Sequence, residues 1–154
     1  MIAITGAGEY LDIIRPYDEI LLNKLKDDPY VLSFPTAAGL ESDERIQYWL
    51  DLGDEHFTKL NVNHKSIRAL NVDDYNKPET LAEIEKANFI YFSGGNPNHL
   101  YDTLSSSLAW EKLLTIHNKG GILAGCSAGA MIMGEKMNKG KGFGFFKNSM
   151  VLPH

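Results

Sequence analysis

The segment ILAGCSAGAM (residues 122–131) decides the fold that the sequence predicts. A short apolar run enters Gly125-Cys126-Ser127-Ala128-Gly129, which has the pattern G-x-S-x-G, and helix-forming residues follow it. In a strand, sharp turn and helix of this kind, the serine is held in a strained conformation with its hydroxyl directed out of the sheet. The pattern therefore predicts a nucleophilic Ser127 at the carboxyl end of a buried strand.

Strand-like and helical segments alternate on the N-terminal side of this turn. We expect strands at residues 2–5, 30–34, 66–72, 89–92 and 122–124, and helices at 18–27, 42–57, 78–87 and 99–117. Strands separated by helices of ten or more residues form a parallel sheet with right-handed crossovers and helices on both faces. The predicted class is α/β, a three-layer sandwich around a mostly parallel central sheet.

The composition is that of one globular domain over residues 1–154. The chain is 44% hydrophobic and 23% charged, and its 20 acidic and 15 basic residues give a net charge of −5. This balance repels a phosphate backbone, which disfavours nucleic acid as a partner. The longest mostly apolar stretch, residues 122–133, is shorter than the ~20 residues that a membrane helix needs. We therefore expect no membrane segment. The single Cys126 can form no internal disulfide, so we expect a cytoplasmic protein.

Four loops are expected on one rim of the sheet. They are residues 6–8, 35–39, 94–96 and 125–127, each following a predicted strand. Ligands of open α/β sheets bind at this rim. The helix after Ser127 directs its first N–H groups here, so the N–H of Ala128 is a predicted oxyanion donor. Gly95, in the adjacent loop, is predicted to supply the second donor.

Three segments resemble the peptidase E and cyanophycinase family of serine peptidases: GCSAGA (residues 125–130), FSGGN (92–96) and LPH (152–154). The resemblance implies a class I glutamine amidotransferase-like fold, which is flavodoxin-like in architecture. It also implies that Ser127 is the nucleophile, His154 the general base, and Gly95 and Ala128 the oxyanion donors. The expected substrates are small peptides, in particular aspartyl peptides, and no metal ion or cofactor is expected.

The chain departs from this family in three respects. Family members continue well past the histidine, so we expect a chain truncated at its C-terminal end, whose unpaired sheet edge would favour a homodimer. Glu135 is the one carboxylate between Ser127 and His154, and it is either the third catalytic residue or a surface residue beside a Ser–His dyad. Asn96 and His99 are predicted to contact the substrate, with His99 standing where many relatives have glutamine. A truncated, catalytically impaired member of the same fold is the main alternative.

Two other side-chain types compete for a functional role. Cys126 also has small residues on both sides, but the glycines at 125 and 129 favour Ser127 as the nucleophile. His56 and His64 lack acidic or cysteine partners at ligand spacing, so we predict no metal site.

An RNA-binding module is the third hypothesis. The segment KGFGFFKN (residues 141–148) is similar to the aromatic octamer of an RNA recognition motif, with Ile90-Tyr91-Phe92 as its partner strand. The last octamer position is Asn148 rather than an aromatic residue. Only seven residues follow Lys147, too few for the helix and strand that must come next. The sequence therefore favours a loop whose phenylalanines cover the rim of a pocket.

Overall fold

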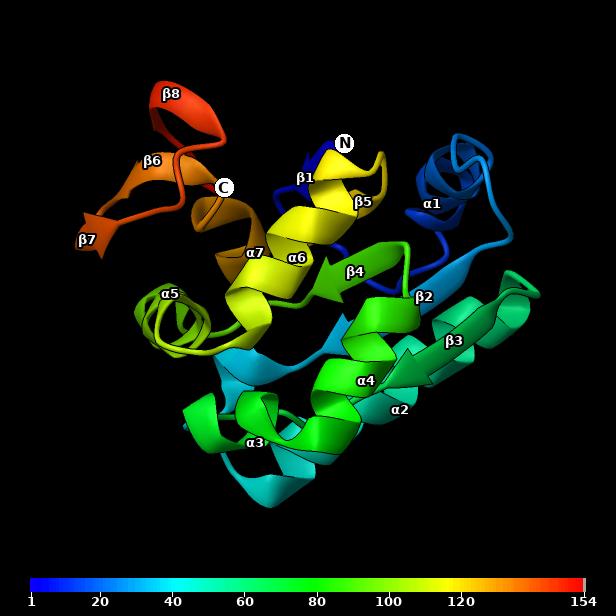
Figure 1. Cartoon of the computed structure of the whole chain (residues 1–154), viewed down its shortest axis with the longest axis horizontal. Helices are drawn as coiled ribbons and strands as arrows, with labels where there is room; N and C mark the ends of the chain where they lie inside the picture. Colours follow the sequence, from blue (N-terminus) through cyan, green and yellow to red (C-terminus); the bar gives the residue numbers. More distant parts are fainter. Residues whose placement is uncertain (154) are drawn as a thin grey trace.

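The central sheet has five strands that all run in the same direction (Figure 1). The computed structural model describes residues 1–153. In sheet order the strands are β1 (Ile2–Thr5), β5 (Ile122–Cys126), β4 (Phe89–Phe92), β2 (Tyr30–Phe34) and β3 (Asn63–Ser66). Because β5 lies between β1 and β4, the segments that follow these three strands meet at one rim.

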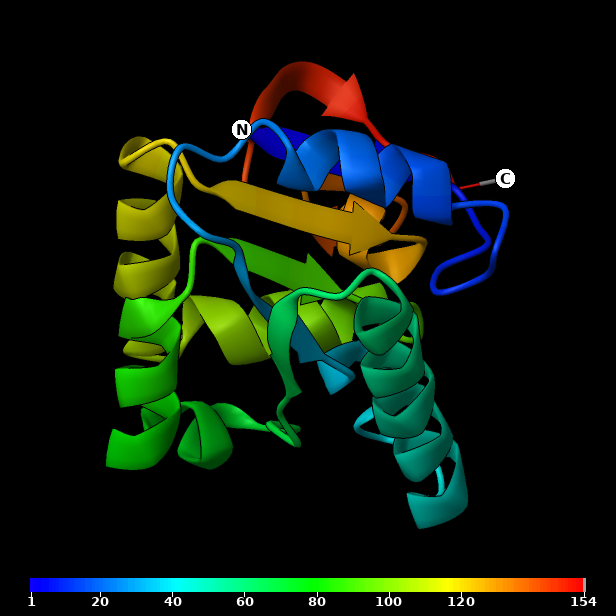
Figure 2. The ribbon, with the colours of Figure 1, turned by 90° about the vertical axis from the view of Figure 1, so that its right-hand side faces the viewer.

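Helices cover both faces of this sheet, and Figure 2 shows α4 and α6 on one side and α2 on the other. The helices are α1 (Arg15–Leu22), α2 (Asp43–Lys59), α3 (Val72–Asn76), α4 (Pro78–Lys86), α5 (Pro97–Ser105), α6 (Ala109–Asn118) and α7 (Ala128–Met131), with a short 3-10 helix, η1 (Thr36–Ala38). Alternate residues of the buried strands enter two separate cores: Ile90 and Phe92 pack on one face, and Phe89 and Tyr91 on the other. This arrangement confirms the predicted three-layer α/β fold.

Several predicted boundaries differ from the structure. The first helix is Arg15–Leu22 instead of residues 18–27. The third strand is Asn63–Ser66 instead of residues 66–72, because an edge strand with alternating exposure carries no apolar run. The predicted helix over residues 99–117 is two helices, α5 and α6, which are separated at residues 106–108. The fifth strand continues to Cys126, so Ser127 follows it directly.

A small second sheet follows the turn at Ser127 and helix α7. It contains β6 (Gly134–Met137), β7 (Gly140–Lys141) and β8 (Phe146–Met150) in the order β7-β6-β8. The chain then returns to the rim, where a Cβ at Gly6 would lie 2.0 Å from the carbonyl oxygen of Pro153. The last described residue therefore packs against the turn after β1.

A buried acid–histidine pair joins α1 to α2. The carboxylate of Asp18 lies 2.8 Å from Nε2 of His56, and both side chains are almost completely buried. The ring of His56 also contacts Tyr10, with 5.7 Å between centroids. Since buried polar groups are stable only with partners, this pair specifies how the two helices pack.

Replacing Asp18 tests the contribution of this pair. Asp18→Ala leaves Nε2 of the buried His56 without its acceptor, so the free energy of unfolding should fall by about 2–3 kcal/mol. Asp12→Ala is the matched control, because Asp12 pairs with Arg15 on the surface and should contribute about 0.5 kcal/mol or less. Urea unfolding of both variants at pH 7 measures the difference. Equal losses in the two variants would contradict the assignment.

Candidate active site

Ser127 occupies a strained turn between β5 and α7. Its backbone has φ 51° and ψ −109°, a conformation that non-glycine residues rarely adopt. The N–H of Ser127 donates to the carbonyl oxygen of Thr5 (3.1 Å), and its own carbonyl accepts from Ala130 and Met131. These three hydrogen bonds hold the strained conformation in place.

The two glycines of the G-x-S-x-G pattern are required by close backbone packing. A Cβ at Gly125 would lie 2.2 Å from the carbonyl carbon and oxygen of Gly129. A Cβ at Gly129 would lie 2.2 Å from the carbonyl oxygen of Phe92, the last residue of β4. The first turn of α7 therefore rests directly on β5 and β4, which no larger side chain would allow.

The loop after β4 lies beside Ser127. A Cβ at Gly94 would be 3.3 Å from Cβ and 3.6 Å from Oγ of Ser127, and Ser127 itself is partly exposed. Gly95 has φ 139°, and a Cβ there would meet the carbonyl of Ala37 at 2.4 Å. The N–H of Asn96 donates to that same carbonyl oxygen (2.7 Å), so η1 supports the loop from behind.

The two predicted oxyanion donors have no acceptor within residues 1–153. In the loop after β4, the N–H groups of Ser93, Gly94 and Asn96 donate to Phe34, Glu9 and Ala37 respectively. Among the described residues, neither the N–H of Gly95 nor that of Ala128 makes a hydrogen bond. The amide of the exposed Gly95 is therefore available to a ligand at the rim where Ser127 is partly exposed, whereas Ala128 is buried and its part as a donor stays a prediction.

Asn96 and His99 are bound to other parts of the protein. Oδ1 of Asn96 accepts from the N–H groups of Asn98 and His99 (3.0 and 3.1 Å) and caps α5. Nε2 of His99 donates to the carbonyl oxygen of Leu70 (2.7 Å). These contacts leave the amide nitrogen of the exposed Asn96 for substrate, and a substrate role for either residue stays a prediction.

Glu135 and His154 are the other two predicted catalytic residues. Glu135, on β6, is half-buried, and its carboxylate accepts from the N–H of Asn148 (2.6 Å). It therefore fixes the course of β8, and its part in catalysis stays a prediction. His154 lies outside the described residues, although Pro153, which precedes it, packs on Gly6 next to Thr5, the residue that accepts from Ser127.

Cys126 is buried behind the turn. Its Sγ donates to Oε2 of Glu9 at 3.0 Å, and burial together with this hydrogen bond raises the pKa of the thiol to about 12. A thiol with this pKa is protonated near neutral pH and cannot act as a nucleophile. The geometry favours Ser127 over Cys126.

Glu9 is a site residue that the sequence analysis missed. It is buried, and its two carboxylate oxygens bind the N–H of Gly94 and the thiol of Cys126, both at 3.0 Å. The sequence marked residues 6–8 as a rim loop but treated them as a plain turn. An acidic residue directly after a rim loop was the available signal.

The RNA-binding hypothesis finds no support in the packing of the aromatic segment. Phe143 stacks on Trp110 with 3.5 Å between centroids, and Phe145 packs edge-on to the same ring. Residues 146–150 pair with β6, whereas β4 pairs with β2 and β5. The two phenylalanines therefore cover α6 and do not stand on a sheet face next to β4.

Residues 1–153 show neither a cluster of metal ligands nor a membrane-spanning helix. No group of three or more histidine, cysteine or carboxylate side chains gathers as a metal ligand set there. Within the same residues, no helix has the length and apolar character needed to cross a membrane.

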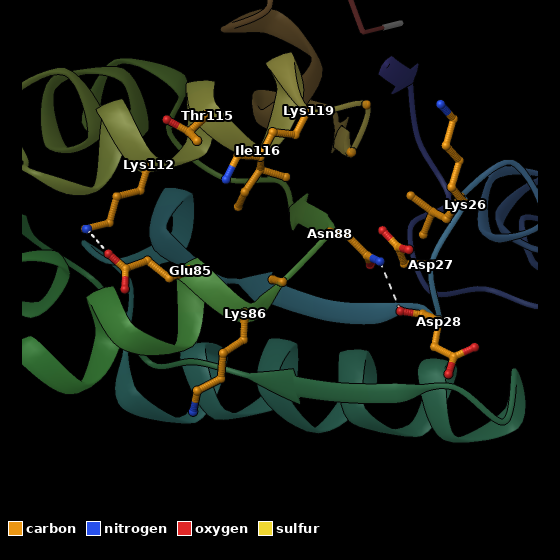
Figure 3. Close-up of a pocket in the computed structure, with 14 residues that line it drawn as sticks. Lys26, Asp27, Asp28, Glu85, Lys86, Asn88, Lys112, Thr115, Ile116 and Lys119 are labelled. Carbon is orange, nitrogen blue, oxygen red and sulfur yellow. Dashed lines mark hydrogen bonds and ion pairs between the residues drawn. The ribbon is translucent and has the colours of Figure 1, made fainter.

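A pocket of about 610 Å³ lies at the other end of the sheet (Figure 3). It is lined by the residues that precede β4 and β5 and by the C-terminal ends of α4 and α6, among them Lys86, Asn88 and Lys119. Lys112 pairs with Glu85 across it. None of its described lining residues is a serine, cysteine or histidine, and it is separate from the turn at Ser127.

Comparisons with known proteins agree with this geometry. The sequence profile of peptidase family S51 matches residues 1–148. A peptidase from an acI-B1 Actinobacterium, known from its crystal structure, superposes with a TM-score of 0.93 and 35% sequence identity, over 99% of this chain and 67% of its own. A putative peptidase E protein from Listeria monocytogenes EGD-e has the same fold, with a TM-score of 0.61 and 20% identity over 86% of this chain and 60% of its own. No curated protein sequence matches significantly. By sequence and by fold, this chain belongs to peptidase family S51, a family of serine-type peptidases.

Proposed function

We propose that the chain is a serine peptidase of the peptidase E type that hydrolyses small peptides through Ser127. The observation that carries this proposal is the position of Ser127: a partly exposed hydroxyl on a strained turn, beside a loop whose Gly95 N–H has no acceptor among the described residues. Nucleophile turns of hydrolases combine these same two features.

The reaction proceeds in two steps. Oγ of Ser127 attacks the peptide carbonyl carbon while His154 accepts the hydroxyl proton, and the carbonyl oxygen becomes an oxyanion. The N–H groups of Gly95 and Ala128 bind that oxyanion. The C–N bond then breaks, and the leaving amine takes the proton from the histidine. Water releases the acyl group by the same route in reverse.

The oxyanion donors account for a large part of the expected rate. Removal of one such donor typically costs about 10²–10³ in kcat. Ala128 offers its N–H at the start of α7, where the first N–H groups of a helix have no intrahelical acceptor. Gly95 offers its N–H from a backbone that Ala37 holds in place.

The substrate preference is the second part of the proposal. Resemblance to the peptidase E family suggests short peptides with an aspartyl residue, and the exposed amide nitrogen of Asn96 is a suitable donor to such a carboxylate. Hydrolysis of Asp-Leu, Asn-Leu and Leu-Leu dipeptides at equal concentration compares the preference for acid, amide and apolar residues.

Covalent labelling tests the nucleophile. A fluorophosphonate probe should phosphonylate Ser127 in the intact chain, since the P=O oxygen can occupy the oxyanion site. Ser127→Ala should lose the label, Cys126→Ala should still carry it on Ser127, and Ser105→Ala, an exposed serine on α5, serves as the matched control. Peptide mass spectrometry identifies the labelled residue. No labelling of the folded chain between pH 6 and pH 9 would favour the catalytically impaired alternative.

Cys126 should be chemically silent while the protein is folded. Because its thiol is buried and its pKa is raised to about 12, the thiolate fraction at pH 8 is about a thousandfold below that of an ordinary cysteine. Iodoacetamide should therefore modify the chain quickly in urea and hardly at all in native buffer, as followed by intact mass. A native rate within tenfold of the unfolded rate would rule out the buried, protonated thiol.

A further inference from the structure

We infer that Glu9 is a positioning residue, which holds the 94–96 loop against the nucleophile turn and thereby sets the direction of the Gly95 N–H. The inference rests on the proposed function, because the proposed reaction uses the Gly95 N–H whose direction Glu9 would set.

Glu9 joins two segments that are far apart in the sequence. Oε1 accepts the N–H of Gly94 and Oε2 accepts the thiol hydrogen of Cys126, each at 3.0 Å. Gly94 immediately precedes Gly95, and Cys126 immediately precedes Ser127. One carboxylate thus connects the neighbours of the oxyanion donor and of the nucleophile.

The close approach of Glu9 leaves no room for movement of the loop toward it. A Cβ at Gly94 would lie 2.7 Å from Oε1 of Glu9 and 3.3 Å from Cβ of Ser127. The backbone of Gly94 is therefore held between the carboxylate and the nucleophile. A side chain at position 94 would push them apart.

The backbone next to Glu9 is itself held firmly. Tyr10 has φ 64°, which is rare for a large side chain, and its buried ring lies against Trp49, His56, Phe57 and Tyr91. Strain of this kind persists only where the surroundings fix the conformation. The aromatic cluster therefore fixes Tyr10, and Tyr10 fixes the position of the preceding Glu9.

The hydrogen bonds on both sides of Gly95 determine where its N–H points. The N–H of Gly94 donates to Glu9, and the N–H of Asn96 donates to Ala37 (2.7 Å). Two fixed peptide groups leave the peptide between them little freedom to rotate. Loss of the Glu9 bond would free one side and misdirect the oxyanion donor.

Glu9 is not a candidate general base. Both of its oxygens already accept hydrogen bonds from Gly94 and Cys126, and the side chain is buried. Its contacts are with the neighbours of the reacting groups and not with Oγ of Ser127. It acts through the loop, which makes it a positioning residue.

Two substitutions separate positioning from stability. Glu9→Met has similar length but no acceptor, whereas Glu9→Gln keeps one carbonyl oxygen for the N–H of Gly94. Glu83→Gln is the matched control, because Glu83 is a half-buried carboxylate that accepts a side-chain hydrogen bond from Tyr30 and lies on α4, outside the aromatic cluster around Tyr10. All three variants are compared at a temperature where circular dichroism shows them fully folded.

Two measurements are made on each variant: the rate of Ser127 labelling by the fluorophosphonate, and amide hydrogen exchange in residues 93–96. Glu9→Met should slow labelling by about 10²-fold, the usual effect of one lost donor, and accelerate exchange in residues 93–96 relative to β2. Glu9→Gln should restore labelling to within about tenfold of the parent chain, because a carbonyl oxygen again accepts from Gly94. Glu83→Gln should change labelling by less than about twofold, since the hydrogen bonds of Glu83 go to Tyr30 and Lys86 and involve neither segment.

The outcomes distinguish the inference from the proposed function. Unchanged exchange in residues 93–96 of Glu9→Met overturns the inference, whatever the activity. Faster exchange in residues 93–96 with an unchanged labelling rate also overturns the inference, because Glu9 would then hold the loop without affecting the reactivity of Ser127. If the parent chain takes no label but Glu9→Met still loosens the loop, the proposed function fails while the role of Glu9 in holding the loop stands.

Discussion

The absence of a Cβ at Gly125 and Gly129 is the constraint on which the rest of the site depends. With side chains there, atoms would lie 2.2 Å from the backbone of Gly129 and Phe92, and α7 could not rest on β5 and β4. The close packing of α7 on these two strands requires a sharp turn of the chain at Ser127, whose φ is 51°. The glycine spacing therefore places Ser127 beside the loop after β4, in the position that the proposed reaction requires.

Strand order then decides which loops can reach Ser127. Because β5 lies between β1 and β4, Ser127 has the turn after β1 on one side and the loop after β4 on the other. The first turn brings Glu9 and the contact with Pro153, and the second brings Gly95. The opposite end of the sheet holds the C-terminal ends of α4 and α6. The pocket there is lined by lysine and carboxylate side chains, and none of its described lining residues is a serine, cysteine or histidine.

The sequence predicts this site well where the signal is local. Buried strands such as Phe89–Phe92 are short apolar runs, and the turn at Ser127 has a spacing that only close packing explains. The prediction from sequence fails where a segment carries no apolar run or helix-breaking residue. The edge strand β3 is polar. The break between α5 and α6 falls at Ser106 and Ser107, without proline or glycine. Glu9 was missed for a related reason, since its two partners are 85 and 117 residues away.

The buried carboxylate of Glu9 binds the residue next to Gly95, where the proposed reaction would form an oxyanion. Like charges in a partly buried site repel, so an ionised carboxylate would oppose the formation of that oxyanion. Glu9 therefore cannot assist the reaction through its charge. Its hydrogen bonds to Gly94 and Cys126 offset part of its desolvation, and they commit the Gly94 N–H to the protein interior. In the proposed reaction, the Gly95 N–H, which has no acceptor among the described residues, is then the amide left for the oxyanion.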